Sequence, residues 1–129
     1  MGQQQLLLII LGVIIVGIAI AVGLSLFSAQ SIQSNKDAII NDLNNIAAQA
    51  YQYRIRPSSM AGGNGSYVGF NIPQKMATNA NAAYTCAPAS NTVTFTATSA
   101  NNAADKVYAA IDTDGKFVQT AWSYTAEFQ

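Results

Sequence analysis

Apolar and polar residues are distributed very unevenly along this chain. Three glutamines, Gln3 to Gln5, precede an uninterrupted apolar stretch from Leu6 to Leu24, and the first charged side chain is Lys36. As a helix, the apolar stretch would be about 28 Å long at about 1.5 Å per residue, close to the ~30 Å hydrocarbon core of a bilayer. The pattern therefore predicts a helix that is apolar on all sides and begins very near the N-terminus.

A second helical pattern follows directly. No Pro or Gly interrupts the chain between Leu24 and Arg56, and apolar residues recur there at intervals of three and four, with one lapse at Lys36. This apolar stripe consists of Ala29, Ile32, Ile39, Ile40, Leu43, Ile46, Ala47, Ala50 and Tyr51. The opposite face carries Gln33, Asn35, Asp37, Asn41, Asp42, Asn45, Gln49 and Gln52. Since Pro57 disfavours a helical residue before it, one helix from about Gln3 to Arg54 is predicted.

The remaining ~75 residues are enough for one small domain. Thr92 to Thr98 alternates strictly, with Val93, Phe95 and Ala97 on one face and threonines on the other. The other stretches typical of strands are Tyr67 to Ile72, Ala83 to Ala87, Lys106 to Ile111 and Lys116 to Tyr124. Because the connections are short, we expect an antiparallel sheet with one face on the helix stripe.

The predicted fold class is therefore α+β, with a long N-terminal helix packed on a small antiparallel sheet. The predicted organisation is a short leader at 1–2, an assembly or transmembrane helix at 3–56, and a β-rich head at 57–129.

Three interpretations of the N-terminal helix compete. A cleaved secretory signal needs a positive n-region and a shorter apolar core, and the nearest exit, Phe27-Ser28-Ala29, has Phe where a small residue belongs. A single-span membrane anchor fits the length but is normally followed by a polar linker or a basic cluster. An assembly helix fits best, because a domain this small cannot cover a helix of about 50 residues.

Small residues in the apolar stretch offer surfaces where helices can approach closely, although their spacing is not the strict Gly-x-x-x-Gly pattern. They are Gly12, Gly17, Ala19, Ala21 and Gly23. The large candidate contact residues for assembly are Leu7, Leu11, Ile14 and Ile18.

Charge and composition limit the classes of function that we expect for this protein. The formal net charge is zero and only 9% of the residues are charged, against the ~25% that is usual. A surface so poor in Lys and Arg disfavours nucleic acid as a partner and suits self-packing. The chain has no His, so the usual general base is missing, and we expect neither an enzyme nor a cofactor. Cys86 is the only cysteine, which leaves a small buried hydrophobe or a reactive thiol as alternatives.

Three features of the head have competing interpretations. The glycine-rich segment Met60 to Ser66 follows a helix rather than a strand, which favours a flexible connector over a phosphate loop. Asn64 begins an Asn-Gly-Ser tripeptide, which is either a glycosylation acceptor or a chance match, and the threonine-rich face is open to O-linked sugars. Asp112-Thr-Asp-Gly115 is typical of a hairpin turn, although Asp112 and Asp114 also resemble part of a calcium loop.

This layout resembles the type IV pilin family, in which a short leader ends in Gly before an apolar segment that continues as an amphipathic helix on a small β-sheet head. The matching parts are Gly2, Gln3 as the first mature residue, Leu6 to Leu24, and Ala29 to Tyr53. The resemblance implies cleavage after Gly2 by a prepilin peptidase. The family usually has Glu at the fifth mature position, where this chain has Leu7, and Gln3 to Gln5 are candidate hydrogen-bonding substitutes.

The resemblance also implies a function. We expect a structural subunit that resides in the cytoplasmic membrane before assembly and then polymerises through its apolar helix into an extracellular pilus-like filament. The partners expected are the membrane, an assembly machinery and other copies of the chain. The alternatives are a monomeric membrane-anchored interaction domain and a minor pilin or pseudopilin of a secretion system.

Overall fold

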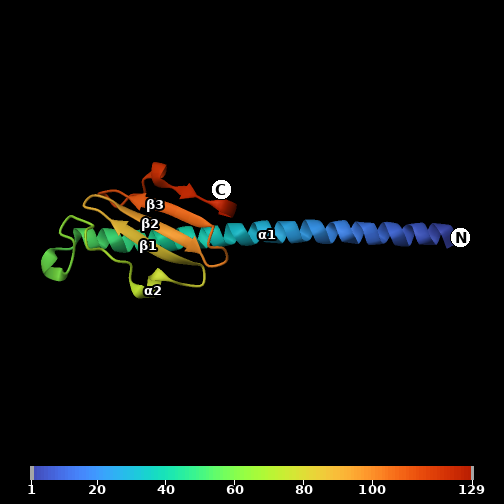
Figure 1. Cartoon of the computed structure of the whole chain (residues 1–129), viewed down its shortest axis with the longest axis horizontal. Coiled ribbons are helices and arrows are strands. Elements are labelled where there is room, and N and C mark those ends of the chain that lie inside the picture. Colours follow the sequence, from blue (N-terminus) through green and yellow to red (C-terminus); the bar gives the residue numbers. More distant parts are fainter. Residues whose placement is uncertain (1, 129) are drawn as a thin grey trace. The chain divides into compact units, whose positions relative to one another are not determined.

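The computed structural model describes residues 2–128 and contains one long helix followed by a four-stranded antiparallel sheet. The helix, α1 (Gly2–Ile55), begins and ends within one residue of the prediction. Contacts divide the chain into two compact units, Met1–Gln33 and Ser34–Gln129. The second unit contains the last part of α1 and all the strands, as the colours in Figure 1 show. The α+β class predicted from the sequence is confirmed.

The sheet is a simple meander in which each strand pairs with the next. It consists of β1 (Ala82–Pro88), β2 (Val93–Ser99), β3 (Lys106–Ile111) and the short β4 (Ser123–Tyr124), in that spatial order. Phe95 lies opposite Cys86 on one neighbouring strand and Ala109 on the other, so the side chains of these three residues lie on the same face of the sheet. The strict alternation of β2 therefore fixes which face of the whole sheet is apolar.

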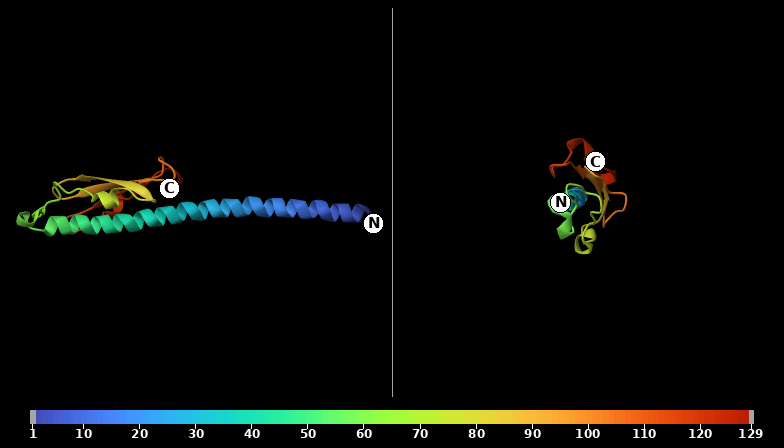
Figure 2. Two further views of the ribbon diagram at one scale, coloured as in Figure 1. Left: turned by 90° about the horizontal axis from the view of Figure 1, so that it is seen from below. Right: turned by 90° about the vertical axis from the view of Figure 1, so that its left-hand side faces the viewer.

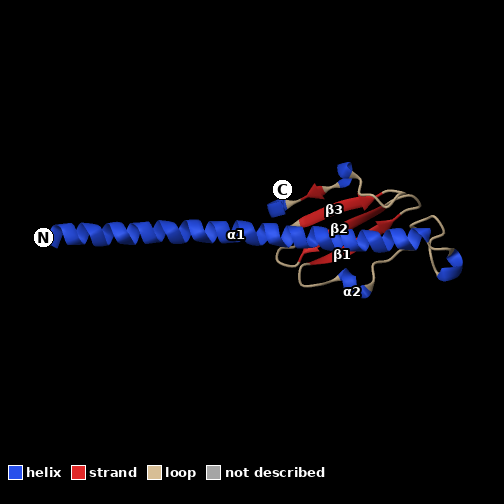
Figure 3. Ribbon diagram, turned by 180° about the vertical axis from the view of Figure 1, so that it is seen from behind, coloured by secondary structure: helices blue, strands red, loops and turns tan. Residues whose placement is uncertain are grey.

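That apolar face packs on the stripe of α1. Figures 2 and 3 show this part of α1, from Ser34 onward, lying along one face of β1, β2 and β3. Large side chains from both elements are completely buried where they meet. These residues are Ile39, Leu43 and Ile46 from the helix, and Val93, Phe95, Val107 and Ile111 from the sheet. The predicted packing of stripe on sheet is confirmed.

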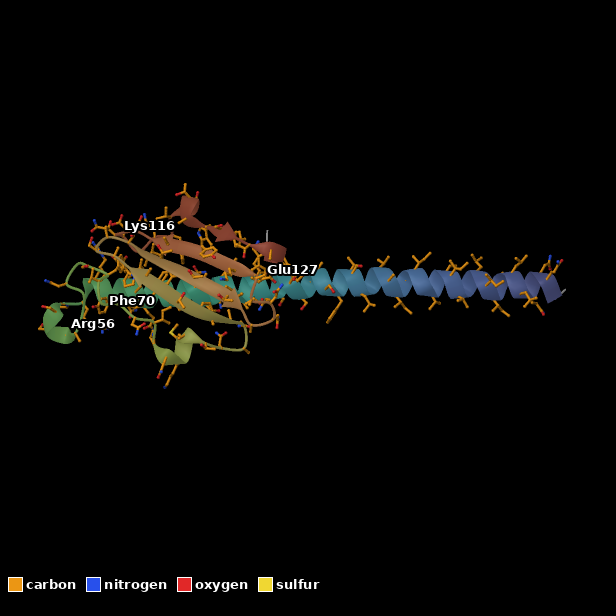
Figure 4. All side chains as sticks on the ribbon, viewed as in Figure 1. Arg56, Phe70, Lys116 and Glu127 are labelled. Carbon is orange, nitrogen blue, oxygen red and sulfur yellow. The ribbon has the colours of Figure 1, made fainter. Side chains whose placement is uncertain are left out.

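The end of α1 is closed by the glycine-rich segment. The main-chain N–H groups of Gly63 and Gly65 donate to the carbonyls of Tyr53 and Arg54, both at 2.7 Å. Asn64 N–H donates to the carbonyl of Arg56, which Figure 4 labels at this end of the head. The segment does connect helix to sheet, as predicted, but it is a hydrogen-bonded cap on the helix terminus rather than a flexible linker.

The predicted strand at Tyr67–Ile72 is wrong. Tyr67, Phe70 and Ile72 are buried as a strand would bury them, but the segment is a turn, in which Phe70 N–H donates to the Tyr67 carbonyl at 2.9 Å. Gly69 has a φ of +89°, which an extended strand does not allow. The short helix α2 (Gln74–Ala77) follows Pro73 and was not predicted.

The predicted strand at Lys116–Tyr124 is mostly wrong as well. Phe117 makes one isolated bridge to Ile111, and the helical turn η2 (Gln119–Ala121) then interrupts the extended chain before β4. A further turn, η3 (Ala126–Phe128), buries Phe128 completely. The apolar and aromatic residues of this segment, which suggested a strand, lie instead in irregular chain that covers the open edge of β3.

Candidate functional site

The first unit presents a continuous apolar surface. Every large apolar side chain from Leu6 to Phe27 is more than half exposed, from 51% for Ile14 to 72% for Phe27. The predicted assembly residues Leu7, Leu11 and Ile18 all lie within this surface. Figure 4 shows side chains projecting from both sides of this part of α1. A helix that is apolar all round is stable only in lipid or among other apolar helices.

Length and composition alone would allow α1 to cross a membrane. The most apolar 18-residue window in α1 has a mean hydropathy of 3.2, and none of it is buried within the chain. Among the described residues, α1 is the one helix that meets this condition. The apolar segment is thus compatible with lipid and, by the same chemistry, with copies of itself.

The glycines of this apolar surface have no side chain, and no other part of the chain lies against them. A Cβ added at Gly12, Gly17 or Gly23 would meet nothing within 4 Å. At about 100° per residue, Gly12 and Gly23 lie on one side of the helix, while Gly17 lies on roughly the opposite side. The helix therefore offers two small-residue surfaces that face different ways.

Sequence reasoning missed one member of the second surface. Gly17, Ala21 and Ser25 are spaced four residues apart, which is a small-xxx-small pattern typical of closely packed membrane helices. Ser25 looked polar, but its hydroxyl donates to the Ala21 carbonyl at 3.1 Å. Since its hydrogen-bonding need is met within the helix, Ser25 is compatible with an apolar environment.

The two residues of the predicted processing site are both helical. Gly2 and Gln3 lie in the first turn of α1, and a side chain at Gly2 would meet no other atom within 4 Å. Cleavage between them stays a prediction.

In the second unit, polar side chains of α1 hold the sheet at the start of the buried stripe. Asn35 accepts a hydrogen bond from the Ser99 hydroxyl at 2.7 Å and donates to the Asn81 carbonyl at 3.2 Å. Lys36, the lapse in the apolar stripe, donates to the Phe128 carbonyl at 3.1 Å and lies 4.0 Å from the centroid of the Tyr124 ring. Lys36 therefore interrupts the apolar stripe because its positively charged side chain fixes the C-terminal segment to the helix.

Asp42 makes the most concentrated polar contact. One of its carboxylate oxygens accepts hydrogen bonds from Tyr84 Oη at 2.6 Å, Asn79 Nδ2 at 2.9 Å and Asn81 Nδ2 at 3.4 Å. Burial raises the pKa of Tyr84, and the hydrogen bond to Asp42 raises it further because it stabilises the protonated phenol. This cluster holds helix and sheet together and leaves Tyr84 poorly suited to act as a base.

The turn predicted at Asp112-Thr-Asp-Gly115 is confirmed. The Asp112 main chain pairs with Lys116, and Asp112 Oδ1 accepts hydrogen bonds from the main-chain N–H groups of Asp114 and Lys116 at 2.9 and 3.1 Å. The Thr113 carbonyl in this turn accepts a hydrogen bond from Arg54. Among residues 2–128, no three His, Cys, Asp or Glu side chains are grouped as a metal would require.

Two other candidate side chains occupy different environments. Asn64, the candidate glycosylation site, is exposed in the cap and has a left-handed backbone with a φ of +50°. Cys86 is half-buried with its Sγ 3.9 Å from the Phe70 carbonyl, and burial raises the pKa of its thiol. A raised pKa means less thiolate at neutral pH, which fits the buried hydrophobe better than the reactive thiol.

Comparisons with protein-family models, with curated proteins and with solved structures found no match. The long apolar N-terminal helix and the small antiparallel sheet are compatible with a pilin-like fold.

Proposed function

We propose that this protein is a structural subunit that polymerises through the apolar N-terminal segment of α1 into a pilus-like filament on the cell surface. The observation that carries the proposal is the exposure of every large apolar side chain from Leu6 to Phe27. Compared with exposure to water, burying about 1,000 Å² of this surface, in lipid or among copies of the helix, would yield about 25 kcal/mol gross at ~25 cal/mol per Å². That exceeds most estimates of the association cost, roughly 4–15 kcal/mol.

One further feature supports a polymer over a dimer. An open polymer needs two different contact surfaces on each subunit, whereas a twofold dimer needs one. The helix has small residues on two sides, at Gly12 and Gly23 and at Gly17 and Ala21, where neighbouring helices can approach closely.

The expected sequence of events is membrane residence, processing after Gly2 by a prepilin peptidase, and transfer of the segment from lipid to its own copies.

A second candidate is a monomeric membrane-anchored interaction domain, which the membrane-spanning length of α1 favours. A minor pilin or pseudopilin of a secretion system lies between the two. An anchor needs only hydrophobicity, whereas a filament also needs close helix packing. Substitutions that keep the first property and remove the second therefore separate the candidates.

The deciding variant is Gly17→Leu. It makes the segment more apolar and meets no atom of its own chain, so membrane insertion is expected to persist. Filaments sheared from cells and seen by negative-stain microscopy should disappear, while Val22→Leu, which enlarges an already large residue, should retain them. Ile14→Asp and Ile18→Lys should also abolish filaments, because each places an unpaired charge among apolar helices.

Wild-type cells without filaments, or abundant filaments in Gly17→Leu and Ile14→Asp cells, would refute the filament proposal. N-terminal sequencing of the sheared material tests processing independently, and we expect it to begin at Gln3.

A further inference from the structure

The face of α1 that points away from the sheet has an unusual composition. From residue 41 to residue 52 its exposed polar side chains are all amides, namely Asn41, Asn44, Asn45, Gln49 and Gln52. We call this set the amide face. Between Asp42, which is turned toward the sheet, and Arg54, the helix has no charged residue. None of the five side-chain amides has a hydrogen-bond partner within the described residues 2–128.

Such a face is not what solubility alone would select. Exposed helix faces of soluble domains usually alternate Lys or Arg with Glu or Asp, because charge keeps copies apart. Amides lack that repulsion, and each one carries both a donor and an acceptor. A surface made of amides is therefore chemically complementary to itself, whereas a face of one charge sign repels its copies.

We propose that the amide face is a second contact surface between subunits, meeting the same face of neighbouring copies of this chain. The inference rests on the proposed filament, in which every subunit is related to the next by one operation, so that an amide face turned toward the filament axis lies beside the amide faces of neighbouring copies and contacts them through its two different edges. The five amides would then hydrogen-bond across the interface, as stacked Asn and Gln side chains do in other polymers of identical chains. The apolar segment would supply most of the affinity, and the amide face would supply geometry without charge repulsion.

The test replaces amides by carboxylates of nearly the same shape. In Asn45→Asp/Gln49→Glu, both sites are exposed, so folding of the single chain should be unchanged. In a filament the added charges of neighbouring copies would face one another, and we expect filament yield to fall at least about tenfold. The control pair, Thr94→Asp/Thr96→Glu, adds the same charge to the opposite surface of the head, on β2, and should leave filament yield at the wild-type level.

Two rescues distinguish charge repulsion from a damaged helix. Raising ionic strength to about 0.5 M shortens the screening length to a few ångströms and should restore assembly. Co-expression with Asn45→Lys/Gln49→Lys should also restore filaments, because opposite charges would then meet.

Filament loss that neither salt nor the lysine variant reverses would overturn the amide-face inference, as would equal loss in the control pair. Wild-type yield in the carboxylate pair would overturn it too, and would show that this face meets solvent or a different protein. In those cases the filament proposal still stands if Gly17→Leu and Ile14→Asp abolish filaments. Absence of filaments from wild-type cells refutes the filament proposal itself.

Discussion

The sheet of this protein depends for its stability on the second half of α1, which gives a sharp prediction about where the chain can be cut. Ile39, Leu43 and Ile46 are completely buried against the sheet. Burying such side chains contributes about 1.5–3 kcal/mol each, so together they contribute about 5–9 kcal/mol. The whole free energy of unfolding of a domain of this size is about 5–15 kcal/mol. A fragment that begins at residue 57 should therefore not fold, whereas a fragment of residues 34–129 should.

The measurement is urea unfolding of the two fragments, followed by the fluorescence of the single tryptophan. Trp122 lies between Phe117 and Tyr124, with ring centroids 4.9 and 6.2 Å away, so its emission reports the packing of the C-terminal segment. We expect one cooperative transition for residues 34–129 and none for residues 57–129. A cooperative transition of similar midpoint in the shorter fragment would refute the reasoning.

A single substitution in the longer fragment checks the magnitude. Ile46→Ala should lower the free energy of unfolding by about 2–5 kcal/mol, because it removes buried methyl groups and leaves a cavity. The neighbouring residue Asn45 is exposed, and Asn45→Ala should change that free energy by no more than about 0.5 kcal/mol. Equal effects of the two substitutions would contradict the packing of the stripe on the sheet.

Three further predictions concern single sites in the head. Gly115→Ala should destabilise it by about 1–3 kcal/mol in chemical denaturation, because Gly115 has a φ of +79° and an added Cβ would lie 2.6 Å from the Tyr51 ring; a neutral result would contradict this close approach. Phe128→Ala should destabilise the head by about 3–5 kcal/mol, and a melting temperature equal to that of wild type would contradict the burial of this side chain. Tyr84 has a raised pKa, so the stability that it contributes is complete below the unfolded value near 10 and is lost as the pH rises toward the folded value. Tyr84→Phe should therefore reduce the fall in stability above about pH 10, with Tyr67 leaving a residual slope, and unchanged slopes would contradict the assignment.

Local patterns predicted the elements that follow a strict period. The second half of α1 and β2 were correct because period and burial coincide there, so that any other conformation would expose the apolar residues that these elements bury. The wrong strand at Tyr67–Ile72 contains apolar residues that are indeed buried, such as Tyr67 and Phe70, but a turn places them. Whether an apolar residue reaches the core from a strand or a turn depends on distant chain, which a local pattern does not contain.

The sequence by itself determined the apolar segment Leu6 to Leu24, its helical continuation and the poverty in charge, since these are properties of composition and spacing. Tertiary structure alone decided the role of Lys36. In the sequence it only interrupts the apolar stripe, but in the fold it lies beside the Phe128 carbonyl and the Tyr124 ring. The same holds for Asp42, whose three partners come from residues 79–84. Such contacts join positions about 40 to 90 residues apart, and only folding brings them together.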